Sequence, residues 1–221
     1  MPTGFAILIA AQFASALADN ALLIVSIALL SQQGLPGWWA PLLKVGFTVS
    51  YVVLAPFVGP LADAWPKGRV MAAMNLVKVG GVLWLLTGAH PVAALAVVGF
   101  GAAAYAPAKY GLVTELVAPH QLVAANGWIE VTVVCAALLG AVLGGLLVSP
   151  WVLESGVASR AAAAVSSLDG GRVGVLAASV GLLLGVYALA SLLNLGVPDS
   201  GARYRPAGWH PGQLLRRFRR A

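Results

Sequence analysis

Charged residues are scarce in this sequence. Only 9% of its 221 residues are Asp, Glu, Lys or Arg, and 60% are hydrophobic. Soluble domains carry about 25% charged residues. The mean hydropathy is +0.91. This composition excludes an ordinary soluble domain and predicts an integral membrane protein.

The sequence also lacks the groups of residues that catalysis or metal binding needs. Cys135 is the single cysteine, which excludes a disulfide within the chain. His90, His120 and His210 have no neighbouring ligand at metal-binding spacing. We find neither a Walker-type phosphate loop nor a nucleophile paired with a base. We therefore predict a protein that is not an enzyme and that carries no metal and no resident cofactor.

The sequence instead contains a series of long apolar runs. Each has roughly the 20 residues that a helix needs to cross a bilayer. Short segments rich in Gly, Pro or charge separate most of them, and a longer, nearly neutral loop, 151–172, lies between the last two. The runs are 5–30, 41–62, 70–88, 92–111, 126–148 and 173–197. They predict an all-α bundle of six transmembrane helices within residues 1–200.

The first run has an alternative interpretation. Residues 5–18 resemble the core of a signal peptide with an Ala-x-Ala cleavage site. No basic residue precedes this core, however, and strong hydrophobicity resumes over residues 21–30. A membrane span is therefore the better prediction.

Basic residues set the expected orientation. Lys67 and Arg69 lie between the second and third spans, and six of the 13 Lys and Arg residues lie beyond residue 200. Because basic segments near spans stay in the cytoplasm, we predict that both termini are cytoplasmic and that 201–221 form a basic tail. This tail either lies on the anionic inner leaflet or is a solvated end or linker. The net charge of +6 could indicate a nucleic-acid partner, but the arginines of this tail account for much of it. Orientation in the membrane explains these arginines better, so no nucleic-acid partner is expected.

Asp19 and Asn20 lie in the middle of the first apolar run. A carboxylate at the centre of a membrane helix costs about 3 kcal/mol on insertion scales, so such a residue usually faces a protein interior or a wet pathway. Gln12, Ser15, Asp19 and Ser26 are spaced by three, four and seven, which places them on one narrow helical face. This face predicts a helix that lines a cavity.

Further polar residues lie at membrane depth in the later spans. The pairs that share a helical face are Asn75 with Lys78, Tyr105 with Lys109, and Asn126 with Glu130. Pro107 removes a backbone donor in the fourth span and can free a carbonyl toward a wet interior. Two lysines and two carboxylates are therefore available at membrane depth, where pairing would reduce the cost of inserting them.

The segment after the second span combines a glycine-bearing turn with several charges. Its residues are Gly59, Asp63, Lys67, Gly68 and Arg69, with Glu115 at the cytoplasmic end of the fourth span. Their order resembles the signature loop between the second and third helices of the major facilitator superfamily. The resemblance implies a cytoplasmic gate, in which carboxylates and cations pair and separate as two helical bundles rock. The alternative is an ordinary interfacial loop.

Four stretches narrow this resemblance to the bacterial lysophospholipid transporter family. They are 18–23, 55–70, 101–111 and 125–127, and the similarity covers most of residues 5–150. The resemblance implies a three-plus-three helical repeat, equivalent to the N-terminal half of a twelve-helix transporter. It also implies movement of lysophospholipids across the bacterial inner membrane toward the cytoplasm, where an acyltransferase partner reacylates them.

The chain departs from the family because it has six spans where the fold has twelve. The substrate pathway normally lies between the two halves. Transport would therefore need a separate C-terminal half, a second copy of this chain, or a longer parent protein. The rival predictions are a drug or small-solute exporter of the same superfamily and a non-transporting membrane partner of a lipid-modifying enzyme.

We predict that Asp19, Asn20, Lys78, Lys109 and Glu130 line the substrate or ion pathway. Asp19 and Asn20 offer oxygens to a coupling cation, sodium or a proton, and Lys109 meets the substrate phosphate. The alternative is that these charges pair with one another and only hold the helices in register.

Small residues recur in the fifth span. Gly140, Gly144 and Gly145 form a face that permits close helix contact. It resembles the glycine-rich fifth helix of superfamily antiporters but lacks the usual proline. We interpret it as a packing face.

Overall fold

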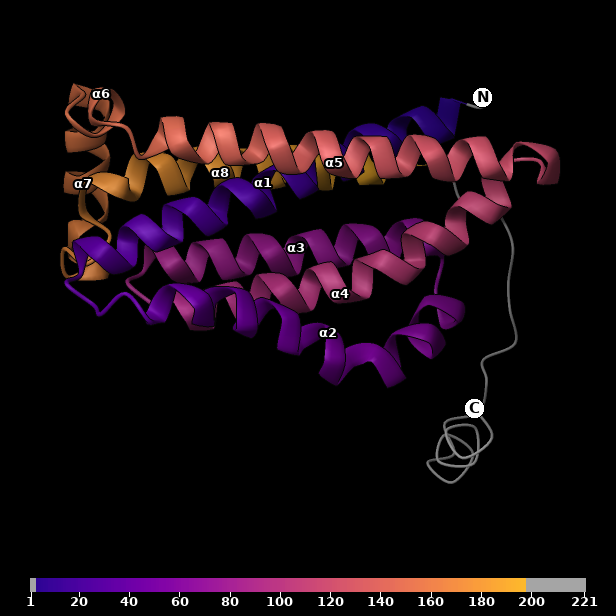
Figure 1. Cartoon of the computed structure of the whole chain (residues 1–221), viewed down its shortest axis with the longest axis horizontal. Coiled ribbons are helices and arrows are strands. Elements are labelled where there is room, and N and C mark those ends of the chain that lie inside the picture. The colour runs from indigo at the N-terminus through magenta and orange to yellow at the C-terminus, as the bar shows by residue number, and fades with distance from the viewer. Residues whose placement is uncertain (1–2, 198–221) are drawn as a thin grey trace.

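Six long helices pack side by side in the structure, and consecutive ones run in opposite directions (Figure 1). The structure is a computed structural model that describes residues 3–197, with the backbone alone for residues 56, 57 and 59–64. The long helices are α1 (Thr3–Gln32), α2 (Trp39–Ala64), α3 (Lys67–Leu86), α4 (Pro91–Leu116), α5 (Leu122–Leu147) and α8 (Ala177–Leu195). They correspond in order to the six predicted spans. The predicted tail, 201–221, lies outside the described residues.

The lengths and composition of these helices fit a membrane. Five of them, α1, α3, α4, α5 and α8, are long and apolar enough to cross a bilayer, and α2 has an apolar stretch over Trp39–Ala55. The predicted fold class, an all-α membrane bundle, is confirmed. The start of α1 and the end of α8 lie at one end of the bundle, which we call the terminal end (Figure 1). The opposite end, where α1 joins α2 and α3 joins α4, is the distal end.

The loop between the second and third spans, predicted to begin near Gly59, is only two residues long in the structure. Gly59 and Asp63 lie inside α2, and only Trp65 and Pro66 separate α2 from α3. Trp65 is extended (φ −127°, ψ 154°), as expected for a residue that precedes proline. The helix therefore continues through Gly59 and Asp63 and ends at Ala64, two residues before Pro66.

The segment between the fifth and sixth spans was predicted as a loop, and this was wrong. It contains α6 (Pro150–Leu153), α7 (Gly156–Asp169) and the 3-10 turn η2 (Gly174–Leu176). The Ser155 hydroxyl caps α7 by accepting from the Ala158 amide (3.2 Å), and Gly170 ends it with a positive φ of 62°. A search for membrane spans misses such a helix because it has only 14 residues and several of them are polar. In Figure 1, α7 runs across the distal end.

The chain after α7 is fixed by one carboxylate. Asp169 accepts from the backbone amides of Gly171 (2.7 Å) and Val173 (2.8 Å). Burial alone would raise the pKa of this carboxyl, but these backbone donors lower the pKa below its usual value. Arg172 donates to the Gly88 carbonyl, and Gln32 donates to the Val173 carbonyl. These contacts tie the α7–α8 connection to the distal ends of α3 and α1.

The helix pairings support the implied three-plus-three repeat. If α1, α2 and α3 are equivalent to α4, α5 and α8, the pair α1–α5 is equivalent to the pair α4–α2, and both pairs are in extensive contact. The pair α1–α8 is likewise equivalent to the pair α4–α3, and both are in contact. A repeat of three helices with inverted orientation produces this pattern, and it places α1 and α4 at equivalent positions.

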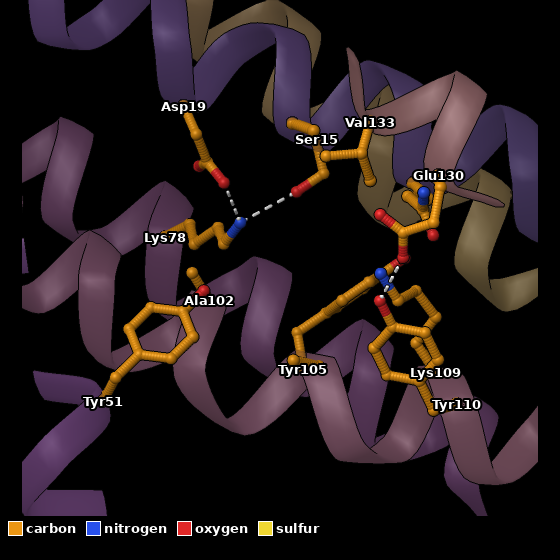
Figure 2. Close-up of a pocket in the computed structure, with 13 residues that line it drawn as sticks. Ser15, Asp19, Tyr51, Lys78, Ala102, Tyr105, Lys109, Tyr110, Glu130 and Val133 are labelled. Carbon is orange, nitrogen blue, oxygen red and sulfur yellow. Dashed lines mark hydrogen bonds and ion pairs between the residues drawn. The ribbon is translucent and has the colours of Figure 1, made fainter. Parts of the chain in front are cut away.

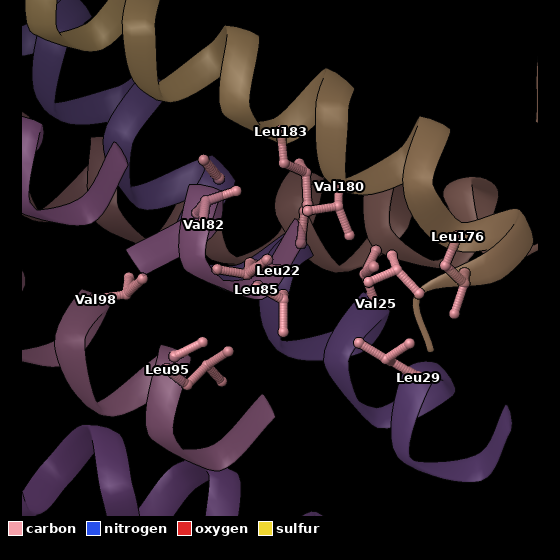
Figure 3. Packing of buried hydrophobic residues seen from close by; sticks show 14 of the residues in the cluster. Leu22, Val25, Leu29, Val82, Leu85, Leu95, Val98, Leu176, Val180 and Leu183 are labelled. Carbon is pink, nitrogen blue, oxygen red and sulfur yellow. The ribbon is translucent and has the colours of Figure 1, made fainter. Parts of the chain in front are cut away.

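Two hydrophobic clusters stabilise the bundle, one toward each end. The distal cluster joins α1, α3, α4 and α8 through residues such as Leu22, Val25, Leu85, Leu95 and Val180 (Figure 3). The cluster nearer the terminal end includes Phe5, Leu8, Met71, Leu112 and Ile129. On α1, the polar residues Gln12 and Ser15 lie between the two clusters. The apolar packing thus leaves a polar layer inside the bundle.

The predicted packing face of α5 is confirmed at two of its three glycines. A Cβ on Gly140 would lie 2.6 Å from the Leu17 carbonyl oxygen, and one on Gly144 would lie 2.8 Å from the Ile24 Cβ. Both positions press against α1. A Cβ on Gly145 would meet nothing within 4 Å. The close contact between α5 and α1 therefore depends on Gly140 and Gly144.

We expect Gly144→Ala to lower the stability of the bundle, because its methyl group would collide with Ile24 and the Ala21 carbonyl of α1. Overpacking of this kind costs roughly 1–3 kcal/mol. Gly145→Ala is the matched control and should preserve or slightly raise stability, since alanine favours a helix by about 1 kcal/mol. Thermal unfolding of the purified protein in detergent measures both. Equal midpoints for the two variants would contradict this account of the interface.

Candidate functional site

A cavity of about 270 Å³ opens in the polar layer between α1, α2, α3, α4 and α5 (Figure 2). We call it the central cavity. Its lining consists of Gln12, Ser15, Ala16, Asp19, Tyr51, Lys78, Ala102, Tyr105, Ala106, Lys109, Tyr110, Glu130 and Val133. The wall is therefore made of four ionisable groups, three tyrosines and several small apolar side chains.

Asp19 and Lys78 form an ion pair in this cavity. The Lys78 ammonium donates to Asp19 Oδ2 at 2.7 Å and to the Ser15 hydroxyl at 2.9 Å. The Tyr187 hydroxyl, on α8, donates to the other carboxylate oxygen of Asp19 at 2.7 Å. Both oxygens of Asp19 are thus hydrogen-bonded, and the pair links α1, α3 and α8. The exposed fraction is 16% for the Asp19 side chain and 2% for that of Lys78.

The surroundings of Lys78 compensate for its burial. Its ammonium lies 5.7 Å from the ring centroid of Tyr105 and 5.8 Å from that of Tyr187, which places two aromatic faces near the cation. Ser15 also donates to Asn75 Oδ1 at 3.0 Å. Burying a charge is tolerable only when it is paired and hydrogen-bonded, and Lys78 meets this condition.

Lys109 lies in the same cavity without such compensation. It is 7% exposed, and within the described residues it has no ion pair and no hydrogen bond to its ammonium. Its ammonium lies 4.3 Å from the ring centroid of Tyr110. The Tyr110 hydroxyl donates to Glu130 Oε1 at 2.9 Å. Lys109 and Glu130 therefore share the cavity wall without forming a direct ion pair.

The predicted pathway residues are largely brought together. Asp19, Lys78, Lys109 and Glu130 all line the central cavity, but Asn20 does not. The Asn20 amide nitrogen donates to the Ala16 carbonyl at 2.8 Å, and its Cβ lies close to Gly140.

The predicted polar stripe on α1 is only partly a cavity wall. Gln12, Ser15 and Asp19 line the central cavity. Ser26 does not, and its buried hydroxyl has no hydrogen-bond partner within the described residues. Sequence reasoning did not identify Tyr51, Tyr110 or Tyr187. Tyr187 is fully buried, and the available signal for it was a tyrosine within an apolar helix, since a buried phenol hydroxyl needs a partner. Tyr51 and Tyr110 are exposed and gave no such signal.

Charges also meet at the terminal end. Lys67, in the first turn of α3, forms an ion pair with Glu115 near the end of α4, and both side chains are nearly buried. Arg69 is exposed in the same turn of α3, beside Gly68. The side chain of Asp63 lies outside the described residues. The charge cluster predicted from the sequence therefore includes at least one contact between α3 and α4.

Comparison with known proteins identifies the family of this bundle. The model of the Major Facilitator Superfamily matches residues 8–200. The chain belongs to the Major Facilitator Superfamily. It is also 40% identical over 208 residues to proteins named lysophospholipid transporter LplT in Yersinia pestis (strain Pestoides F) and Yersinia pseudotuberculosis serotype O:3 (strain YPIII). These alignments cover 94% of this chain and 45% of each relative. The chain thus spans about half the length of the curated relatives that it matches.

We expect the two lysines of the central cavity to differ in their effect on stability. Lys78→Gln removes one partner of a buried ion pair, which costs about 3–5 kcal/mol, whereas Lys109→Gln removes an unpaired cation and should not destabilise the bundle. The double variant Asp19→Asn with Lys78→Gln should regain much of the loss, because no charge is left unpaired. Thermal unfolding of the four proteins, including the wild type, measures this. A loss at Lys109 as large as that at Lys78, or no recovery in the double variant, would contradict the assignment.

Proposed function

We propose that this chain forms one half of a transporter that moves lysophospholipids across the bacterial inner membrane toward the cytoplasm. The observation that carries the proposal is Lys109, a buried cation in the central cavity with no ion pair within the described residues. A phosphate needs such a donor, and a charge-assisted hydrogen bond is stronger than a neutral one. The similarity to transporters named for lysophospholipids supports the same substrate class.

The acyl chain of such a lipid would lie outside the central cavity, which is large enough only for a headgroup. The faces of α5 and α2 beside it carry exposed apolar side chains, among them Val131, Val134, Leu138, Val49 and Val52. In our proposal these faces contact either the acyl chain or the partner that completes the pathway. That partner is the remaining part of a longer parent protein, a separate C-terminal half or a second copy of this chain. A cytoplasmic acyltransferase would then receive the lipid.

The proposed gate lies at the terminal end, which would face the cytoplasm because Lys67 and Arg69 are there. The Lys67–Glu115 ion pair would hold α3 against α4 while the pathway is closed on that side. A coupling cation at Asp19 also remains part of the proposal. Since Lys78 and Tyr187 engage both Asp19 oxygens, a proton or a sodium ion would bind Asp19 only in a state in which the Lys78 ammonium has moved away from it.

Binding of a fluorescent lysophosphatidylethanolamine to the chain in lipid nanodiscs tests the phosphate role. Lys109→Gln should weaken this binding about tenfold or more, since a hydrogen bond to a charged group contributes roughly 1.5–3 kcal/mol. Lys109→Arg should retain most of it. A monoacylglycerol, which has no phosphate, should bind the wild type and the Lys109→Gln variant equally. Unchanged lysophospholipid binding in Lys109→Gln would contradict the proposal.

Flux requires the complete transporter, in proteoliposomes that contain this chain with its second half or with a second copy. Lys109→Gln should reduce lysophospholipid uptake at least as much as it reduces binding. The matched control is Arg160→Gln, on the exposed surface of α7, which should leave uptake unchanged. Competition by cationic drugs but not by lysophospholipids would favour the exporter alternative. Recruitment of a lipid-modifying enzyme without any flux would favour the non-transporting partner.

A further inference from the structure

A second cavity adjoins the central one on the distal side of Tyr51. Its volume is about 180 Å³, and it lies between α1, α2 and α4. We call it the distal cavity. It shares Ala16, Asp19 and Tyr51 with the central cavity, so the two are neighbours separated only by these residues. Its other lining residues are Asn20, Leu23, Lys44, Phe47 and Leu95.

The two cavities follow one another along the bundle axis. Lys44 is five residues from the distal start of α2, which is about 8 Å at 1.5 Å per residue. Tyr51 is seven residues further along the same helix, about 10 Å deeper. Lys109 lies seven residues before the terminal end of α4, again about 10 Å from that end. A path through both cavities would therefore pass Lys44, then Tyr51 with Asp19 and Lys78, and then Lys109.

The charge of Lys44 is not neutralised by its surroundings. Lys44 is exposed, and within the described residues no carboxylate pairs with it. The carboxylate that lines the same cavity, Asp19, is already bonded to Lys78 and Tyr187. The Lys44 ammonium lies 5.9 Å from the ring centroid of Phe47. A cation thus stands at the side of a small cavity whose remaining walls are mostly apolar, and this combination suits an anionic group attached to a hydrocarbon chain.

We propose that Lys44 and the distal cavity form a second binding site for the phosphate of a single-chain phospholipid, distal to the site at Lys109. This inference rests on the proposed function and adds a place in the pathway where the headgroup binds before or after Lys109. Between the two sites, the Asp19–Lys78 pair presents no net charge to the phosphate. The headgroup would therefore move between two cations that lie on either side of a neutral layer.

The competing explanation is that Lys44 only extends its ammonium to the membrane interface. The two explanations differ in what surrounds a bound headgroup. A lysine that merely reaches the interface has no effect on lipid inside the distal cavity. A binding site at Lys44 places the phosphate beside Phe47 and Leu23, and it loses this lipid when the charge is removed.

A lysophosphatidylethanolamine with a photoreactive group beside its phosphate distinguishes these explanations. The full chain in nanodiscs is irradiated with this lipid, and labelled peptides are assigned by mass spectrometry. We expect labelling in the distal cavity, at Leu23, Phe47 or Leu95, and in the central cavity. Lys44→Gln should reduce distal labelling at least fivefold and leave central labelling unchanged, whereas Lys44→Arg should preserve both. Arg160→Gln, which changes a distal-end cation away from both cavities, is the matched control and should also preserve both.

Distal labelling that persists in Lys44→Gln, or that is missing in the wild type while the central cavity is labelled, would overturn the proposal. Labelling of neither cavity would overturn the proposed function itself, so the two failures are distinguishable. Unlabelled lysophosphatidylethanolamine should compete at micromolar concentration. Inorganic phosphate that competes equally well would overturn the assignment to a lipid, since the site would then need no acyl chain.

Discussion

The ion pair between Asp19 and Lys78 is the interaction on which the arrangement of the site depends. It lies midway along the bundle, where an isolated carboxylate or ammonium would be costly in lipid. The structure reduces this cost with a hydrogen bond from Tyr187 to the carboxylate and one from the ammonium to Ser15. Because α1, α3 and α8 each contribute a group, the pair also fixes these helices relative to one another.

This pairing determines which charge remains available to a ligand. Lys78 and Lys109 line the same cavity, but only Lys78 has a carboxylate partner within the described residues. Glu130, the other carboxylate of the cavity, is hydrogen-bonded by Tyr110 and does not pair with Lys109. A buried cation without a partner is unfavourable for stability, and such groups are typical of binding sites. The phosphate role of Lys109 follows from this asymmetry.

The fold and most of the residues that line the central cavity could be predicted from the sequence. Apolar runs of about 20 residues located the six spans. Ionisable residues within those runs located Asp19, Lys78, Lys109 and Glu130, since each must avoid lipid. The sequence could not show which of these four residues pair, because pairing depends on how each helix is rotated about its axis and how deep it lies in the bundle. Tyr187 illustrates the limit: it contacts a carboxylate 168 positions earlier in the chain. The helix α7 was missed because it is stabilised by its cap and by contacts at the distal end, and not by membrane burial.

The central claim is that substrate phosphate binds Lys109 while the Asp19–Lys78 pair stays intact. A structure of the chain in nanodiscs, determined by electron cryomicroscopy with bound lysophosphatidylethanolamine, tests this claim most directly. The account predicts a phosphate oxygen about 2.7–2.9 Å from the Lys109 ammonium nitrogen, with Asp19 still bonded to Lys78 and Tyr187. Phosphate density on Lys78, with Asp19 released from it, would contradict the account.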